Sequence, residues 1–262
     1  MLRAYGLTDT GLVRRTNEDC FAIHEDLGLC VIADGMGGHN AGEVAARLAV
    51  DAVAHYVRER SAGLSEGSAA EPDVDAWPYG YDPVLSATGN LLRTAVHLAN
   101  AKILEAAISS NRLAGMGTTI VAARAIAGRL SVAHVGDSRL YLLANRQLRQ
   151  VTLDDSWMAS MLEHDPGADP LLLQHHPLRN ALTNVVGARA RTEVHVVEQP
   201  LAGGELMLLS TDGVHGVLDE SRIERMMLEE DDPQAIARRL IKGALARGSR
   251  DNCTAVVARY SA

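Results

Sequence analysis

Short apolar runs of strand length recur along the whole chain and are separated by turns or by longer helical patterns. These runs are FAI (21–23), LGLCVIA (27–33), TTIVAARAI (118–126), LSVAHV (130–135), RLYLL (139–143), EVHVV (193–197), ELMLLS (205–210) and TAVVARY (254–260). Links as short as AGR (127–129) and NRQ (145–147) join neighbouring runs. Such short links favour antiparallel hairpins over a regular β–α–β alternation.

Three longer segments have the periodicity of amphipathic helices, and they cover residues 41–60, 90–109 and 232–248. In the first, polar residues recur every four positions and make one stripe: Glu43, Arg47, Asp51 and His55. A helix with one polar stripe is expected to lie flat on a sheet. Helices that cover pairs of strands predict an α+β fold, a four-layer helix–sheet–sheet–helix sandwich with a central antiparallel β-sandwich.

Two segments lack a core-forming pattern. Residues 61–83 are rich in Gly, Pro, Ser and acidic residues, and we expect an exposed insert there. Residues 154–180 are predicted to form a short helix, a loop and a second helical piece, together a mobile flap. Its apolar surface could pack on the body or meet a protein substrate, and we expect Trp157 to pack. With 262 residues the chain fits one domain, 1–262, that carries both segments.

Composition and charge exclude several classes of protein. Apolar residues make up 47% of the chain and charged residues 22%, as in ordinary soluble proteins. The net charge is −8 and no basic stripe occurs, so nucleic acid is not an expected partner. No apolar run approaches the length of a membrane span, and the N-terminal residues carry no apolar signal region. We therefore expect a cytoplasmic protein without membrane contact.

The cysteines Cys20, Cys30 and Cys253 lie in apolar, strand-like runs and show no Cys-x-x-Cys spacing. Their number and spacing support neither a disulfide framework nor a zinc site. We expect buried free thiols.

The stretch VIADGMGGHNAGE (31–43) ends an apolar run with an aspartate and then loosens the backbone with glycines. Its residues allow three interpretations: a phosphate cradle of backbone N–H groups, a metal site, or a simple Asp-Gly turn. Other apolar runs also place an aspartate at one end, so that the set becomes Asp34, Asp137, Asp212 and Asp251. If these runs share a sheet edge, the carboxylates converge and need cations to offset their repulsion.

An all-oxygen ligand set suits magnesium, manganese or calcium better than zinc or copper. Clustered carboxylates with room for water are typical of two-metal sites that hydrolyse phosphoesters. Arg14 and Arg15 come just before Glu18 and Asp19 and could hold a phosphate, since the planar guanidinium matches its oxygens. An exposed ion pair with these neighbouring acids is the alternative.

Several motifs, in this order, resemble those of the metal-dependent serine/threonine protein phosphatases of type 2C, most closely the bacterial members. The motifs are GLVRRTNEDCF (11–21), VIADGMGGHNAGEVAA (31–46), GMGTTIVAA (115–123), VAHVGDSRLYLL (132–143), HPLRNALTNVVGA (176–188), LLSTDGVHG (208–216) and RDNCTAVVARY (250–260). The resemblance extends from Gly6 to Tyr260, and the motifs are specific in combination rather than singly.

The resemblance implies a centre of two or three divalent cations, Mn²⁺ or Mg²⁺. Asp34 would bridge two of the ions, and Gly35 would offer its carbonyl oxygen to one of them. Arg14 resembles the arginine that grips the phosphate in this family. The other residues implied in metal binding are Asp212 and Asp251 as ligands, Glu18 and Asp19 through water, and Asp137, with Asp212, on a third and weaker ion.

The chain departs from the family pattern at two places. Animal-type members have a histidine directly after the Asp-Gly pair, whereas this chain has Met36, as many bacterial members do. The nearest histidine, His39, is a candidate general acid, and a water bound to metal is the alternative. Bacterial members usually read Asp-His-Ser at the start of the flap, where this chain has Asp154, Asp155 and Ser156.

The resemblance implies a bacterial signalling enzyme that hydrolyses phosphoserine and phosphothreonine in proteins, by attack of a metal-bridging hydroxide on phosphorus. The expected partners are phosphorylated substrates of a serine/threonine kinase, and the expected state is a monomer. A catalytically silent binding or regulatory module is the alternative, but the retained Asp34, Asp212, Asp251 and Arg14 count against it. A nucleotide-binding kinase or ATPase is less well supported, because the glycine-rich stretch lacks the Gly-x-x-x-x-Gly-Lys-Ser/Thr pattern.

Overall fold

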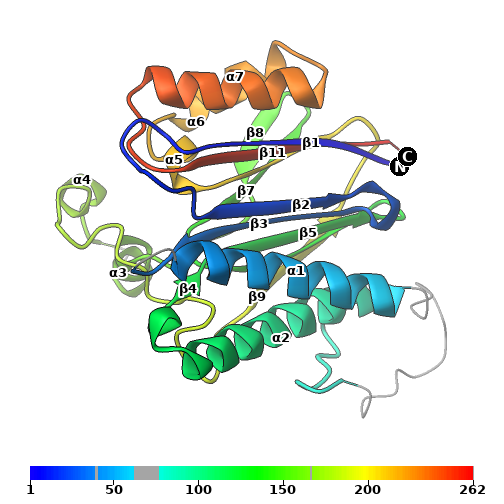
Figure 1. Ribbon diagram of the computed structural model, residues 1–262. Helices are drawn as coiled ribbons and strands as arrows, with labels where there is room; N and C mark the ends of the chain where they lie inside the picture. Colours follow the sequence, from blue (N-terminus) through cyan, green and yellow to red (C-terminus); the bar gives the residue numbers. More distant parts are fainter. Residues whose placement is uncertain (39–40, 62–76, 166, 262) are drawn as a thin grey trace.

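The computed structural model describes residues 1–38, 41–61, 77–165 and 167–261. Two antiparallel sheets form its centre (Figure 1). The first sheet has the order β1 (Leu2–Asp9), β11 (Cys253–Tyr260), β10 (Leu206–Ser210), β7 (Arg139–Ala144), β8 (Gln147–Gln150). The second has the order β2 (Asp19–His24), β3 (Leu29–Met36), β5 (Ile120–Ile126), β6 (Arg129–Val135), β9 (His195–Pro200), with β4 (Gly117–Thr118) paired to β3.

Helices cover the outer face of each sheet, so the molecule has the predicted order helix–sheet–sheet–helix (Figure 1). On the second sheet lie α1 (Ala41–Ser61) and α2 (Ala87–Ser109), followed by the 3-10 turn η3 (Asn111–Leu113). On the first sheet lie α5 (Asp212–His215), α6 (Glu220–Leu228) and α7 (Pro233–Ala246). A further 3-10 turn, η1 (Glu25–Leu27), joins β2 to β3. The α+β four-layer prediction is confirmed.

Three hydrophobic layers hold the sandwich together. The middle layer, between the sheets, contains fully buried aliphatic side chains such as Ile32 and Val132 from one sheet and Leu140 and Leu209 from the other. The outer layers join α1 and α2 to the second sheet, and α6 and α7 to the first. Because leucine, valine, isoleucine and alanine fill these layers, the chain builds a large core with few aromatic residues.

The structure contains strands that the apolar pattern did not predict. Strand β1 runs antiparallel to β11 over its whole length, from Leu2 opposite Tyr260 to Asp9 opposite Cys253. Most of its side chains are only half-buried, so its sequence carries little apolar signal. Strand β8 is short and also partly exposed, and helix α6 was likewise not predicted. The partner strand of β1, β11, lies at the opposite end of the sequence, so a local window of the sequence cannot reveal this pairing.

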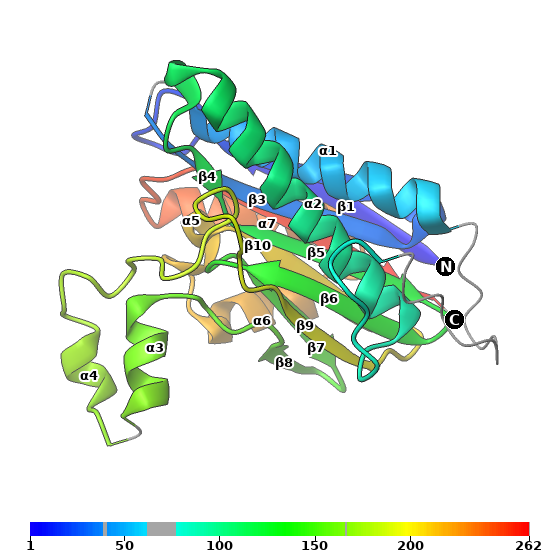
Figure 2. The same ribbon diagram turned by 90° about the horizontal axis from the view of Figure 1, so that it is seen from below.

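The flap leaves the sandwich at the end where α1 begins (Figures 1 and 2). It contains α3 (Trp157–His164) and α4 (Pro170–Leu173), in agreement with the predicted pair of helical pieces. The Trp157 ring stacks on His176 with 4.1 Å between centroids, so this tryptophan packs within the flap. Of the predicted insert, residues 62–76 lie outside the described part of the chain.

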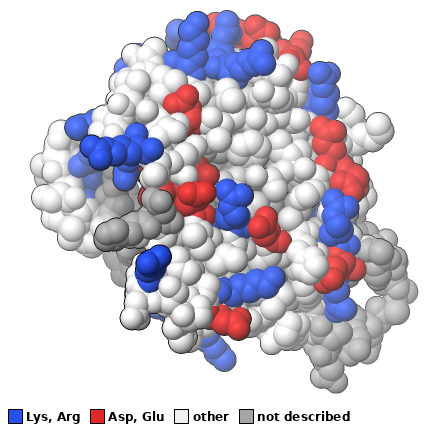
Figure 3. All heavy atoms as spheres, in the orientation of Figure 1, with Lys and Arg blue, Asp and Glu red and all other residues white. Residues whose placement is uncertain are grey.

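Most of the face shown in Figure 3 is uncharged; basic side chains gather along its top, and side chains of both signs mix near its centre and along its right side. None of the helices in the described ranges is long and apolar enough to cross a membrane.

Candidate active site

Two predicted carboxylates face each other across a strand pair. The register of β2 and β3 puts Asp19 opposite Asp34. Asp19 is 8% exposed, and its Oδ2 accepts hydrogen bonds from the hydroxyls of Thr254 (2.6 Å) and Thr211 (2.9 Å). These threonines belong to the other sheet or its edge, so the Asp19 carboxylate joins the two sheets at this end of the sandwich.

The main chain at Asp34 is held in place by a pair of threonines. The Asp34 N–H donates to the hydroxyl of Thr119 (3.0 Å), and the Asp34 carbonyl accepts from the Thr118 hydroxyl (2.8 Å). The Thr119 hydroxyl also lies 2.7 Å from that of Ser138, the neighbour of Asp137. Two of the predicted strand-end aspartates are therefore linked through one short chain of hydroxyls.

Gly35 occupies a position where no side chain fits. A Cβ added there would lie 2.0 Å from the Gly42 carbonyl oxygen of α1 and 2.7 Å from the Glu18 carbonyl oxygen. The Gly35 N–H donates to that Glu18 carbonyl at 3.1 Å. The close approach of the α1 start to the end of β3 therefore requires glycine at position 35.

The strand ends open onto a cavity of about 240 Å³. Its lining brings together these predicted residues: Arg14, Glu18, Asp34, Gly35, Asp137, Asp212 and Asp251. Asp19 does not line the cavity, because it is buried between the sheets opposite Asp34. His39 lies outside the described residues, whereas Met36, which follows the Asp-Gly pair, does line the cavity.

Arg14 reaches the aspartate cluster from an exposed loop. Its Nη2 donates to Asp251 Oδ2 at 2.6 Å, and about half of its side chain is exposed. Asn252 holds this loop: its side-chain amide donates to the carbonyls of Thr10 and Thr16, each at 2.9 Å, and its Oδ1 accepts from the Glu18 N–H at 2.8 Å. Asn252 thus ties the Arg14 loop to the start of β11.

Burial and mutual repulsion raise the pKa values of the clustered carboxyls. Burial is the largest cause in each case. It raises the pKa of Asp19 to about 7, against the threonine hydrogen bonds, and that of Asp137 to about 7 with help from the Asp212 charge. The pKa of Asp212 rises to about 6, with a contribution from Asp251, and that of Asp34 rises well above its ordinary value through burial and the surrounding aspartates.

These residues fit divalent cations. Within the described part of the chain, the buried Oδ1 atoms of Asp19 and Asp212 have no hydrogen-bond partner. No three acidic, histidine or cysteine side chains among the described residues already stand in ligand geometry. The fit therefore rests on the crowding of buried carboxylates, their unsatisfied oxygens and the all-oxygen donor set, which together suit Mg²⁺ or Mn²⁺.

Several residues of the site were not singled out by the sequence pattern. Thr119 and Asn252 also line the cavity, as do Asn180 and Leu182 from the C-terminal side of the flap. The motifs GMGTT and RDN contain the first two, but their role in holding Asp34 and the Arg14 loop depends on contacts with distant segments. Asn180 and Leu182 likewise lie in a family motif, HPLRNALTNVVGA (176–188), but the motif by itself gave neither residue a role.

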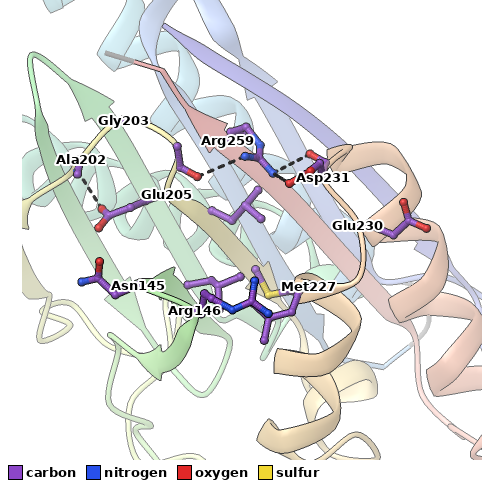
Figure 4. A pocket seen from close by; sticks show the side chains of 13 residues that line it. Asn145, Arg146, Ala202, Gly203, Glu205, Met227, Glu230, Asp231 and Arg259 are labelled. Atoms are coloured by element: carbon purple, nitrogen blue, oxygen red, sulfur yellow. Dashed lines mark hydrogen bonds and ion pairs between the residues drawn. The ribbon is translucent and has the colours of Figure 1, made fainter.

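A second hollow, of about 330 Å³, lies at the opposite end of the first sheet (Figure 4). Its lining includes Leu143, Leu206 and Arg259, which pair at the other end of β7, β10 and β11 from the aspartates. Arg259 donates to Asp231 at 2.9 Å, and other acidic and basic side chains share the rim. Because its charges are of both signs and Asp231 is paired with Arg259, it lacks the carboxylate crowding of the first cavity.

Comparisons with known proteins agree with this arrangement. A family described as Protein phosphatase 2C matches residues 14–243. A serine/threonine phosphatase of Listeria monocytogenes is 32% identical over 253 residues, which cover 95% of this chain and 92% of the relative. The crystal structure of the Mycobacterium tuberculosis serine/threonine phosphatase PstP has a TM-score of 0.82 at 32% identity, covering 100% of this chain and 99% of that one. The PstP catalytic domain in complex with two manganese ions has a TM-score of 0.78 at 31% identity, covering 100% and 99%.

Proposed function

The chain belongs to the protein phosphatase 2C family, and we propose that it hydrolyses phosphoserine and phosphothreonine in proteins with two or three bound Mn²⁺ or Mg²⁺ ions. The observation that carries this proposal is the convergence of half-buried aspartates with raised pKa values on a cavity that also contains an arginine. Such crowding is unfavourable for a protein without cations and is suited to one that binds them.

The residues that would hold the ions are Asp34, the Gly35 carbonyl, Asp212 and Asp251, with Glu18 and Asp19 acting through water, and Asp137, together with Asp212, at a third, weaker ion. When bound, the cations supply Lewis acidity that polarises the phosphoryl oxygens and lowers the pKa of water. The threonine pair at Asp34 holds its main chain in place at the strand end. Glu18 is positioned by the Asn252 side chain, which holds its N–H.

Arg14 would bind the phosphate oxygens. One of its N–H groups is used by Asp251, and the exposed guanidinium keeps other donors for a substrate. The planar fork allows a bidentate contact to a phosphoryl group, which lysine cannot make. His39 remains the proposed proton donor to the leaving hydroxyl.

The proposal extends to the setting of the enzyme. All of residues 1–262 act as one catalytic domain, with the flap, residues 154–180, as a part of it. The substrates are phosphoproteins of a serine/threonine kinase, and the protein works as a cytoplasmic monomer in bacterial signalling. Cys30 and Cys253 are buried free thiols as expected, whereas Cys20 is free but only half-buried. Free thiols fit a reducing compartment.

Phosphate release from a phosphothreonine peptide tests the function. We expect turnover with manganese or magnesium, none with a chelator, and recovery when the metal is added back. The same ions should raise the melting temperature, since about 2.7 kcal/mol of stability follows when a ligand is present at 100 times its Kd. Full activity in chelator would contradict the metal-dependent mechanism, and peptide binding without turnover at any metal concentration would favour the silent module.

A further inference from the structure

The two ends of the flap are joined to each other where they leave the sandwich. This flap neck consists of residues 154–158 and 179–184. Ser156 and Leu182 form an isolated β-bridge, and the Trp157 N–H donates to the Ala181 carbonyl at 2.8 Å. The Thr183 N–H donates to the Asp155 carbonyl at 2.8 Å. The orientation of the whole flap is therefore set at this neck.

The Asp155 side chain connects the neck to three other segments. Its Oδ2 accepts from the Gly136 N–H (2.8 Å) and from the Asn184 amide (2.9 Å). Its Oδ1 accepts from His195 Nε2 (2.9 Å). Gly136 directly precedes Asp137 and has a φ of +96°, so its turn leaves little freedom at that point. The Asp155 carboxylate thus connects the flap neck to the turn that carries Asp137.

His195, the hydrogen-bond partner of Asp155, comes from the edge strand β9. It lies opposite His134 of β6, and the two rings stack with 5.1 Å between centroids. Burial, and then the neighbouring His195, lower the pKa of His134 to about 4, so His134 is neutral near pH 7. The Asp155 hydrogen bond raises the pKa of His195 above 6.5, against its burial and with smaller contributions from Glu193 and Glu163.

The Asp155–His195 pair also coincides with a departure from the family pattern. Asp155 occupies the place where the resembled bacterial phosphatases usually have the histidine of Asp-His-Ser, and here the imidazole comes instead from residue 195. Asp155 is 13% exposed in its side chain, and burial raises its pKa. The hydrogen bonds from His195, Gly136 and Asn184 offset burial, so the net pKa is lowered and the carboxylate stays charged.

We propose that His195 is a positioning residue that acts through Asp155: the hydrogen bond between them fixes the flap neck and so sets the affinity for a protein substrate, without taking part in the chemistry at phosphorus. This proposal rests on the proposed phosphatase function.

The geometry explains why the effect should fall on large substrates. The neck itself carries Asn180, which lines the cavity, and beyond the neck the flap carries the exposed apolar side chains Leu171 and Leu172. A phosphopeptide long enough to reach these residues depends on the orientation of the flap. A small ester such as p-nitrophenyl phosphate reaches only the aspartate cluster and Arg14.

Paired kinetics on the magnesium- or manganese-loaded full chain test the proposal. For His195→Leu we expect the KM of a phosphothreonine peptide to rise roughly 10- to 150-fold, the range that corresponds to a lost hydrogen bond to a charged group. The kcat for p-nitrophenyl phosphate should stay within about 2-fold. His195→Gln keeps an N–H donor at the place of Nε2, and should restore the peptide KM to within about 3-fold of wild type.

His55 offers a matched control. It makes a histidine–carboxylate pair with Glu59 at 3.3 Å on the exposed face of α1, away from the flap. His55→Leu should change neither substrate's kinetics. Equal losses on both substrates in a folded His195→Leu protein would overturn the proposal, and so would an unchanged peptide KM.

A second readout does not depend on activity. NMR titration of the His195 ring in the magnesium-loaded protein should give a pKa above 6.5, which falls toward that value in Asp155→Asn. The groups that face this ring are Asp155, His134, Glu193 and Glu163, so replacing only Asp155 isolates the pair. An ordinary pKa unaffected by Asp155→Asn would refute the pair. A normal NMR result with no phosphatase activity in wild type would instead refute the proposed function.

Discussion

The guanidinium of Arg14 donates to the Asp251 carboxylate at 2.6 Å, across 237 positions of the sequence. Arg14 belongs to the loop before β2, and Asp251 precedes β11 on the other sheet. The contact therefore places a cation at the mouth of the aspartate cavity and keeps its remaining donors available to a phosphoryl group.

Replacing Arg14 should weaken both substrate affinity and turnover. We expect Arg14→Ala to lower kcat/KM. The loss should correspond to roughly 1.5–3 kcal/mol of transition-state stabilisation, the value of a hydrogen bond to a charged group. Arg14→Lys should recover little, because lysine cannot contact two phosphate oxygens in one plane. Arg15 is the matched control, since it is an exposed neighbour that does not line the cavity. Arg15→Ala should keep kcat/KM within about 2-fold of wild type. Equal activity of wild type and Arg14→Ala would exclude a phosphate-binding role for Arg14.

Asp34→Asn keeps the volume of the side chain but removes its charge. Turnover should fall by more than about 100-fold, because even the loss of a partner behind a metal ligand costs 10–100-fold. In chelator, the same change should raise the free energy of unfolding, since a buried charge that faces other aspartates is removed. Activity and chemical denaturation measured on one preparation check both effects. If Asp34→Asn kept near wild-type activity, the role of Asp34 would be limited to forming the Asp-Gly turn.

The chelated protein should become less stable as the pH rises. Burial, and then the charges of Asp212 and Asp154, raise the pKa of Asp137 from 3.8 to about 7. A carboxyl whose pKa is raised by folding stabilises the native state at low pH, and this contribution is lost as the pH rises through the folded-state pKa. The free energy of unfolding should therefore fall between about pH 4 and pH 7, by on the order of a few kcal/mol for this group.

Denaturant titrations from pH 4 to pH 8 in chelator measure this fall. Asp137→Asn should make it less steep, whereas Asp51→Asn, on the exposed side of α1, should leave it unchanged. Magnesium or manganese should restore stability at the upper end of the range. The same slope in wild type and Asp137→Asn would show that the Asp137 carboxyl is not a source of the pH dependence.

The tip of the flap should matter for proteins and not for small esters. Removing residues 165–169 takes out the link between α3 and α4, including Asp169, whose carboxylate caps α4 by accepting from the Leu171 N–H at 2.9 Å. Hydrolysis of p-nitrophenyl phosphate should stay within a few-fold of wild type, and phosphopeptide turnover should fall further. If both activities fell equally in a folded, metal-loaded variant, the flap would belong to the catalytic machinery.

Local sequence patterns determined much of this protein. Apolar runs with short links predicted antiparallel sheets, and polar stripes predicted the helices that cover them, because the periods of side-chain direction differ between strands and helices. The aspartates at the ends of those runs could also be found this way, since Asp34 follows an apolar run directly and Asp137 and Asp212 each follow one after a single residue. These features depend on neighbours within a few positions.

Tertiary structure alone decided how these pieces meet. The pairing of β1 with β11, the Asn252 amide that holds the Arg14 loop and the Asp155–His195 pair all join segments that are far apart in the sequence. Burial of Asp19 between two sheets, which raises its pKa to about 7, likewise has no local signature. Contacts of this kind arise when hydrophobic layers bring distant segments together, so a pattern read along the chain identifies the participating residues but not their partners.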